Sequence, residues 1–155
     1  MIKILFICHG NICRSPMAEF VMKDLVKREG LEGEFYIASC ATSREEIGNG
    51  VHPGTKRKLR EVNISCDGKY AVQLTKQDYE TYDYLLAMEQ YNITNMKRII
   101  GDDRDHKVYR LLDFSDKKRD IADPWYTGNF DITYQDIVEG CQAFLAYVRE
   151  QGQCK

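Results

Sequence analysis

The sequence has no long hydrophobic run and no segment typical of a linker between domains. Its apolar stretches are far shorter than the roughly 20 residues that a membrane-spanning helix requires. The N-terminal residues enter a short strand pattern at once, so they lack the features of a signal peptide. No stretch rich in proline, glycine or serine interrupts the 155 residues. We therefore expect residues 1–155 to form a single domain that is cytoplasmic and has no membrane partner.

The chain also lacks an excess of either charge. Its 22 basic residues nearly balance 24 acidic ones, which gives a formal net charge of −2. Lysine and arginine are scattered along the chain, so nothing indicates a nucleic-acid partner. Six cysteines are present, but without an export signal we expect reduced thiols instead of a disulfide framework. We expect the protein to be a monomer.

The most informative segment, residues 8–16, reads CHGNICRSP. A short apolar run at residues 2–7 precedes it, and residues 17–26 repeat their apolar positions at helical spacing. The loop of such a strand-loop-helix unit receives several backbone N–H groups and the positive end of the helix dipole. We therefore predict a phosphate-binding loop directly after the first strand.

Individual residues of this loop suit an anion. Gly10 permits a positive φ and a close approach of the backbone, and Asn11 tolerates the left-handed conformation and can brace the loop with its amide. Ser15 and Pro16 stand where a helix cap and a first-turn proline are expected. The spacing of cysteine and arginine alone is weak evidence, because it also fits an inert buried thiol and a surface charge. The coincidence of strand, glycine, cap and helix favours the phosphate loop.

Cys8 and Arg14 predict nucleophilic chemistry on a phosphoryl group. A helix N-terminus and a nearby guanidinium both stabilise a thiolate, which would make Cys8 a nucleophile. Arg14 offers a planar fork of donors that can hold two phosphoryl oxygens while the phosphorus becomes trigonal bipyramidal. Ser15 could donate a hydrogen bond to the sulfur and make it a better leaving group. We expect phosphoryl transfer to sulfur and then to water.

Cys13 has two interpretations that the sequence leaves open. It lies five residues from Cys8 across a tight loop, so oxidation could join the pair reversibly and protect the nucleophile. Alternatively, Cys13 packs beneath the loop as a small apolar residue.

A second segment, Asp123-Pro124-Trp125-Tyr126, supplies a candidate proton donor. It follows a highly charged stretch and precedes a Thr-Gly-Asn sequence, so we predict a loop. An aspartate beside two aromatic side chains can be partly desolvated and protonated, and can act as general acid and then as general base. Trp125 and Tyr126 would form walls for a flat substrate ring. Taken alone, the segment is more typical of an exposed turn whose aromatic residues pack onto the protein.

The two motifs together resemble the low-molecular-weight protein tyrosine phosphatase family. Length and motif order agree, as do residues 41–43 (Ala-Thr-Ser) after the second strand and residues 48–49 (Gly-Asn) in the variable loop. The resemblance implies that Cys8 is the nucleophile, Arg14 the phosphate clamp and Asp123 the acid and base. It implies phosphotyrosine proteins or aryl phosphates as substrates, and neither a metal nor a cofactor. The phosphate- or substrate-binding positions that it implies are His9, Gly10, Asn11, Ile12, Cys13, Ser15, Trp125 and Tyr126.

The chain departs from the family pattern at several positions. His9 replaces a residue that is usually apolar or small, and Glu45 stands near a position that often holds an aromatic residue. With both at the mouth of the pocket, we expect a preference for basic or neutral peptides over acidic ones. Lys69 stands where relatives have a histidine that supports the loop, so that support is expected to be lost. Glu89 replaces a frequent aspartate.

Three other functions remain compatible with parts of the sequence. An arsenate reductase resembles this fold and loop but needs further cysteines on a mobile segment, and residues 84–91 contain none. A phosphocysteine carrier of a sugar phosphotransferase system also has a cysteine after its first strand, but does not pair it with this arginine and an Asp-Pro loop. A protein-arginine phosphatase of the same family usually has threonine where Ile12 stands, and its acid loop lacks the Trp125-Tyr126 pair.

Strand and helix patterns alternate along the chain, which predicts an α/β fold: a single three-layer domain with a four-stranded parallel sheet flanked by helices. In such sheets ligands bind at the carboxyl ends of the strands, where Cys8 would lie. Asp123 can reach this edge only if the loop after the fourth strand folds back over it. The expected strands are residues 3–8, 35–40, 84–88 and 107–111, and the expected helices are residues 16–29, 55–61, 76–82, 90–100 and 132–150.

Overall fold

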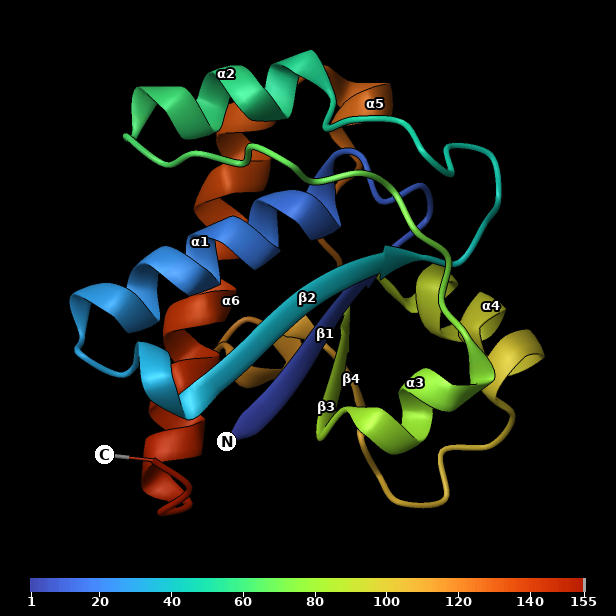
Figure 1. Ribbon diagram of the computed structural model, residues 1–155, viewed down its shortest axis with the longest axis vertical. Coiled ribbons are helices and arrows are strands. Elements are labelled where there is room, and N and C mark those ends of the chain that lie inside the picture. The colour runs from blue at the N-terminus through green and yellow to red at the C-terminus, as the bar shows by residue number, and fades with distance from the viewer. Residues whose placement is uncertain (155) are drawn as a thin grey trace.

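Four parallel strands form one sheet in the computed structural model, which describes residues 1–154 (Figure 1). Their order is β2-β1-β3-β4, so the first strand is central. This arrangement confirms the predicted α/β fold. Within the described residues, no helix is long and apolar enough to cross a membrane. The strands are β1 (Ile2–Cys8), β2 (Phe35–Ala41), β3 (Tyr84–Ala87) and β4 (Val108–Arg110).

Helices cover both faces of the sheet, as Figure 1 shows. One face carries α1 (Arg14–Arg28) and α6 (Phe130–Glu150), with α2 (Pro53–Glu61) packed against both of them. The other face carries α3 (Lys76–Thr81) and α4 (Gln90–Ile100). The structure also has a short helix, α5 (Pro124–Thr127), and two 3-10 turns, η1 (Glu32–Glu34) and η2 (Leu111–Phe114).

The central strand β1 is apolar on both faces because each face packs against a separate helical layer. Ile4 and Phe6 belong to the core shared with α1 and α6, whereas Leu5 and Ile7 belong to the core shared with α3 and α4. A strand buried on both faces has a continuous apolar sequence instead of an alternating one. The run at the N-terminus is therefore the sequence signature of the middle of this sheet.

The expected strands and helices agree with the observed ones to within two residues at each end, but two local predictions were wrong. Helix α1 begins at Arg14 with Cys13 at the N-cap, so Ser15 lies inside the first turn and is not the cap. Residues 124–127 form a one-turn helix instead of an irregular loop. Its cause is local: the Asp123 side chain accepts a hydrogen bond from the Trp125 N–H, and Pro124 occupies the first helical position.

Strand order brings the first and third strands side by side at their carboxyl ends. The chain leaves β1 toward α1 on one face of the sheet and leaves β3 toward α4 on the other. This divergence opens a crevice at the point where the strand order reverses, which is where open α/β sheets bind ligands. Cys8 at the end of β1 and Glu89 just after β3 both lie at this edge.

Packing of α6 against η2 depends on a glycine. A Cβ added to Gly140 would lie 2.5 Å from Cγ of Leu111, which is fully buried. We predict that Gly140→Ala lowers the free energy of unfolding by about 1–3 kcal/mol through overpacking, although alanine itself favours a helix. Urea denaturation of the purified variant measures this change. Gln142→Ala changes an exposed residue on the same helix, and its free energy of unfolding should stay within about 0.5 kcal/mol of wild type. A free energy of unfolding in Gly140→Ala that equals that of wild type would contradict the packing argument.

Candidate active site

The loop after β1 surrounds the Cys8 thiol with hydrogen-bond donors. Asn11 N–H donates to Cys8 Sγ at 3.3 Å, and Ser15 Oγ lies 3.0 Å from the same sulfur. Asn11 has a φ of 58°, as the sequence predicted for a left-handed position. Gly10 does not have a positive φ, so that expectation was wrong. Its lack of a side chain instead leaves room for Glu46, whose Cγ would lie 3.4 Å from a Cβ on Gly10.

Asn11 braces the loop from inside the protein. Its amide nitrogen donates to Ser15 Oγ at 2.7 Å and to Ser39 Oγ at 3.0 Å, and its amide oxygen accepts from the Val72 N–H at 3.2 Å. Because Asn11 donates to Ser15 Oγ, the Ser15 hydroxyl can donate its own proton, either to Cys8 Sγ at 3.0 Å or to the Cys40 carbonyl at 3.4 Å. A hydroxyl donor in this position stabilises negative charge on sulfur.

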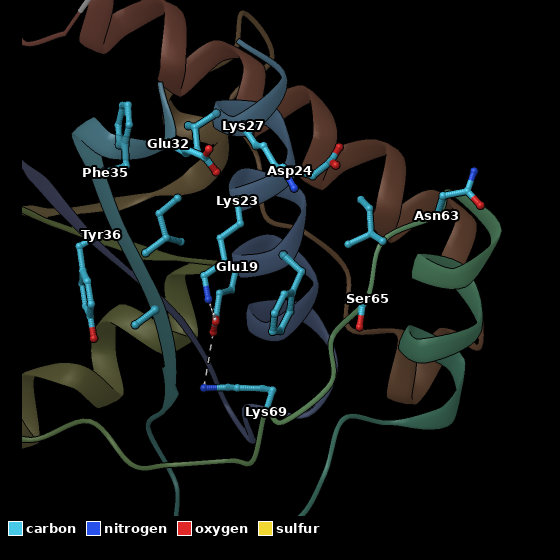
Figure 2. Close-up of a pocket in the computed structure, with 15 residues that line it drawn as sticks. Glu19, Lys23, Asp24, Lys27, Glu32, Phe35, Tyr36, Asn63, Ser65 and Lys69 are labelled. Atoms are coloured by element: carbon cyan, nitrogen blue, oxygen red, sulfur yellow. Dashed lines mark hydrogen bonds and ion pairs between the residues drawn. The ribbon is translucent and has the colours of Figure 1, made fainter. Parts of the chain in front are cut away.

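A buried ionic network extends this bracing to the surface (Figure 2). Glu19 on α1 accepts a hydrogen bond from Ser39 Oγ at 2.6 Å through one oxygen and from Lys23 Nζ at 2.6 Å through the other. Lys69 Nζ donates to the Ser39 carbonyl at 2.8 Å and lies 3.6 Å from Glu19 Oε1. The expected loss of loop support was therefore wrong, because the lysine supplies a cation at this place.

Sequence reasoning missed Glu19 and Ser39 as members of this network. The available signal was the spacing of Ser15, Glu19 and Lys23, which lie four residues apart and therefore share one face of α1. Ser39 had no comparable signal, because only the pairing of β2 beside β1 places it next to Asn11.

We predict that Lys69→Met lowers kcat for an aryl phosphate about tenfold, because a buried carboxylate loses a partner and the loop geometry relaxes. The Michaelis constant should change less, since the atoms that bind phosphate are retained. Steady-state kinetics of Lys69→Met, with Lys69→His as the rescue, measure this effect. Lys56→Met removes an exposed lysine on α2 and should leave kcat unchanged. Equal kcat in both methionine variants would contradict a positioning role for Lys69.

Arg14 is a buried cation at the floor of the site. Its side chain is 2% exposed, and its Nη1 donates to Glu89 Oε2 at 2.5 Å and to the Ile121 carbonyl at 2.8 Å. Nη2 lies 3.4 Å from Asp123 Oδ2. Burial opposes the charge, but the negative groups that face the guanidinium more than offset it, so the pKa of Arg14 is raised. These groups are Cys8, Asp123 and Glu89.

Asp123 reaches the same edge because the chain after β4 folds back over the sheet. Ile121 N–H donates to the Met88 carbonyl at 2.9 Å, which attaches this segment to the end of β3. Thr133 Oγ1 on α6 donates to the Ala122 carbonyl at 3.1 Å and holds it from the other side. The chain after β4 thus folds back as Asp123 requires, held by one backbone hydrogen bond and one side-chain hydrogen bond that the sequence did not reveal.

These side chains surround a cavity of about 190 Å³ above the loop. Trp125 and Tyr126 stand at its mouth with 58% and 84% of their surface exposed, so they do not pack onto the protein as in an ordinary turn. The Trp125 ring meets the edge of His52 at a centroid distance of 5.7 Å. The lining residues are Cys8, His9, Gly10, Ile12, Cys13, Arg14, Glu45, Glu46, Asp123, Trp125 and Tyr126.

The remaining predicted loop residues have different surroundings. His9 lies at the mouth, where its Nε2 is 2.9 Å from Glu45 Oε2. Ile12 is half-buried, and its carbonyl accepts from the His52 N–H at 2.8 Å. Cys13 is buried, and this burial, followed by the negative charges at Cys8 and Asp123, raises the pKa of its thiol to about 12. Cys13 is therefore a neutral thiol at physiological pH and is not a competing nucleophile.

Comparison with known proteins assigns this site to a family. The model of the family described as low molecular weight phosphotyrosine protein phosphatase matches residues 3–154. The low molecular weight protein-tyrosine-phosphatase YfkJ of Bacillus subtilis is 41% identical over 155 residues, which is 99% of each chain. PtpA of Staphylococcus epidermidis, of the same description, is 33% identical over 100% of this chain and 99% of its own.

Solved structures agree with these relatives. The crystal structure of YfkJ superposes with a TM-score of 0.93 at 42% identity, covering 97% of this chain and 96% of that one. SP-PTP, a low molecular weight protein tyrosine phosphatase from Streptococcus pyogenes, has a TM-score of 0.84 at 40% identity and covers 96% and 93%. The chain therefore belongs to the low-molecular-weight protein tyrosine phosphatase family. It is a cysteine-based phosphotyrosine hydrolase, and a phosphocysteine intermediate is general to this family.

Proposed function

We propose that Cys8, Arg14 and Asp123 carry out the hydrolysis of phosphotyrosine in this chain. One observation supports this assignment above others: Arg14 Nε is buried and has no hydrogen-bond partner among the described residues. A buried guanidinium N–H without a partner is unfavourable, and a phosphoryl oxygen in the loop would satisfy it. The unpartnered donor thus points to an anion directly beside the Cys8 sulfur.

In the first step, the Cys8 thiolate attacks phosphorus as the bond between phosphorus and the tyrosine oxygen breaks. Arg14 and the backbone N–H groups of the loop bind the three equatorial oxygens, whose charge they stabilise in the transition state. Asp123 donates its proton to the departing phenolate oxygen. The products are the phosphocysteine and a neutral tyrosine.

In the second step, the Asp123 carboxylate takes a proton from water, and the water oxygen attacks phosphorus. The sulfur–phosphorus bond breaks and returns its electron pair to Cys8. Ser15 stabilises the departing thiolate by donating its hydroxyl proton to the sulfur, which lies nearer to Ser15 Oγ than its other acceptor, the Cys40 carbonyl. Inorganic phosphate leaves, and Asp123 is protonated for the next cycle.

Substrate recognition follows from the walls of the cavity. The exposed rings of Trp125 and Tyr126 would flank a flat aromatic leaving group, which favours phosphotyrosine proteins and other aryl phosphates. Ile12 contributes an apolar surface nearer the loop. We assign the substrate-binding role to these three residues with His9, Gly10, Asn11, Cys13 and Ser15.

We further propose that residues 1–155 act as one cytoplasmic phosphatase domain and as a monomer. All six cysteines lie within the described residues and are free thiols, which suits a reducing compartment. The proposed nucleophile, phosphate clamp and general acid all line one cavity, so the proposed chemistry does not call for residues of a second subunit.

Hydrolysis of para-nitrophenyl phosphate in the presence of a chelator and a thiol reductant tests the nucleophile. We predict metal-independent turnover by wild type and a fall in kcat to below about one thousandth in Cys8→Ser. Cys154→Ser changes a cysteine far from the site and should retain wild-type activity. Turnover that persists in folded Cys8→Ser, or that disappears with the chelator, would refute the mechanism.

The general acid is tested by the dependence on the leaving group. We predict that Asp123→Asn lowers kcat/KM for phenyl phosphate by about 10²- to 10⁴-fold, and lowers it less for para-nitrophenyl phosphate, whose leaving group needs less protonation. Asparagine can still accept the Trp125 N–H, so α5 should be retained. Asp116→Asn is a charge-matched control at an exposed position. Equal losses for both substrates would argue against proton donation by Asp123.

A further inference from the structure

The mouth of the catalytic cavity carries two carboxylates on one wall. Glu45 and Glu46 lie on the turn after β2, and both line the cavity. Glu45 is exposed, whereas Glu46 is half-buried with its methylene groups over Gly10. Neither of them approaches the sulfur as a hydrogen-bond partner, so the catalytic steps described above do not use them.

Backbone contacts hold these carboxylates in place. Ser43 N–H donates to the His9 carbonyl at 3.0 Å, which attaches the start of the turn to the phosphate loop. At the other end, Gly48 N–H donates to the Ala71 carbonyl at 2.9 Å. Asn49 Nδ2 donates to Glu46 Oε2 at 2.6 Å and orients that carboxylate. The turn that carries both residues is therefore attached to the phosphate loop, and the Glu46 carboxylate has a defined orientation.

Positive charge at the mouth does not neutralise them. Among the described residues that line the cavity, only His9 and Arg14 can be cationic. Arg14 is buried at the floor, where Glu89, Asp123 and the phosphoryl group engage it. His9 pairs with Glu45 alone, which leaves Glu46 without a cation. The nearby Arg44 turns away from the mouth, because its Nε donates to Gln73 Oε1 at 3.3 Å.

The same cavity offers a second feature that suits a cation. Trp125 is 58% exposed, and an indole face attracts ammonium and guanidinium groups. A substrate tyrosine that fills the cavity brings its neighbouring residues close to this ring and to the two carboxylates, since all three residues line the cavity. This position combines an ion pair with a cation–π contact.

We infer that the enzyme selects phosphotyrosine residues that have lysine or arginine next to them in the peptide, and that Glu45 and Glu46 are the specificity-determining residues. The inference rests on the proposed catalytic function of the same cavity. Because the pairs are partly exposed, we expect a moderate preference in kcat/KM, about three- to tenfold for a cationic over an anionic neighbour. The preference should diminish at high ionic strength.

Three phosphotyrosine peptides that differ only in the flanking residues, as lysine, glutamine or glutamate, provide the test. The measured quantity is the ratio of kcat/KM for the lysine and glutamate peptides within each enzyme, which cancels changes in the shared chemistry. We expect a ratio of about three to ten in wild type at low salt, and a ratio near one in Glu45→Gln/Glu46→Gln. Glu32→Gln matches each single variant in charge by removing one exposed carboxylate just before β2, and it should keep the wild-type ratio.

Either a wild-type ratio of one or below, or a double variant that keeps the wild-type ratio, would overturn the inference. If the double variant fails to fold, the single variants and the salt dependence of the wild-type ratio still test the inference. A wild-type ratio that does not fall at high salt would also overturn the inference. Hydrolysis of para-nitrophenyl phosphate distinguishes a failure of the selectivity from a failure of the proposed catalytic function. Wild type that hydrolyses this unflanked substrate but shows no peptide preference refutes only the selectivity, whereas no hydrolysis at all refutes the proposed function.

Discussion

The buried guanidinium of Arg14 is the constraint on which the rest of the site depends. A cation removed from water is strongly destabilising unless partners compensate it, and here the partners come from two other segments of the chain. Glu89 follows β3, and Ile121 and Asp123 lie on the segment that folds back after β4. Satisfying one side chain therefore also places the candidate general acid beside the nucleophile. Nε, the one guanidinium nitrogen of Arg14 without a partner among the described residues, is a donor that a phosphoryl oxygen can use.

A second network gives the thiol its surroundings. The hydrogen bonds run from Ser15 through Asn11 and Ser39 to Glu19, and end at Lys69 near the surface. Each polar group in this interior is satisfied by the next, which fixes the loop in one arrangement. Lys69 places a positive charge beside the Glu19 carboxylate, which offsets the charge of that buried group.

The outer part of the cavity is more exposed than the floor. His9 and Glu45 form a pair at the mouth, and Glu46 and the exposed Trp125 line the same cavity. The floor binds a phosphoryl group that all substrates share, so it cannot distinguish among phosphotyrosine proteins. Any discrimination among them must come from residues at the mouth, where flanking side chains of the substrate pass.

Most of the fold could be predicted from the sequence, because apolar periodicity reports which residues are buried, and the continuous run before Cys8 identified the central strand. One short loop contains both the proposed nucleophile and the proposed phosphate clamp, so the sequence alone was enough to nominate them. The predictions for the φ of Gly10, for the segment after Asp123 and for the start of α1 were wrong. Each of these features depends on contacts that form only in the folded protein. The sequence by itself thus determined the sheet, the loop and their chemistry. Only the tertiary structure decided that Glu89, Asp123 and Lys69 converge on that loop, because strand order and long-range hydrogen bonds bring together residues far apart along the chain.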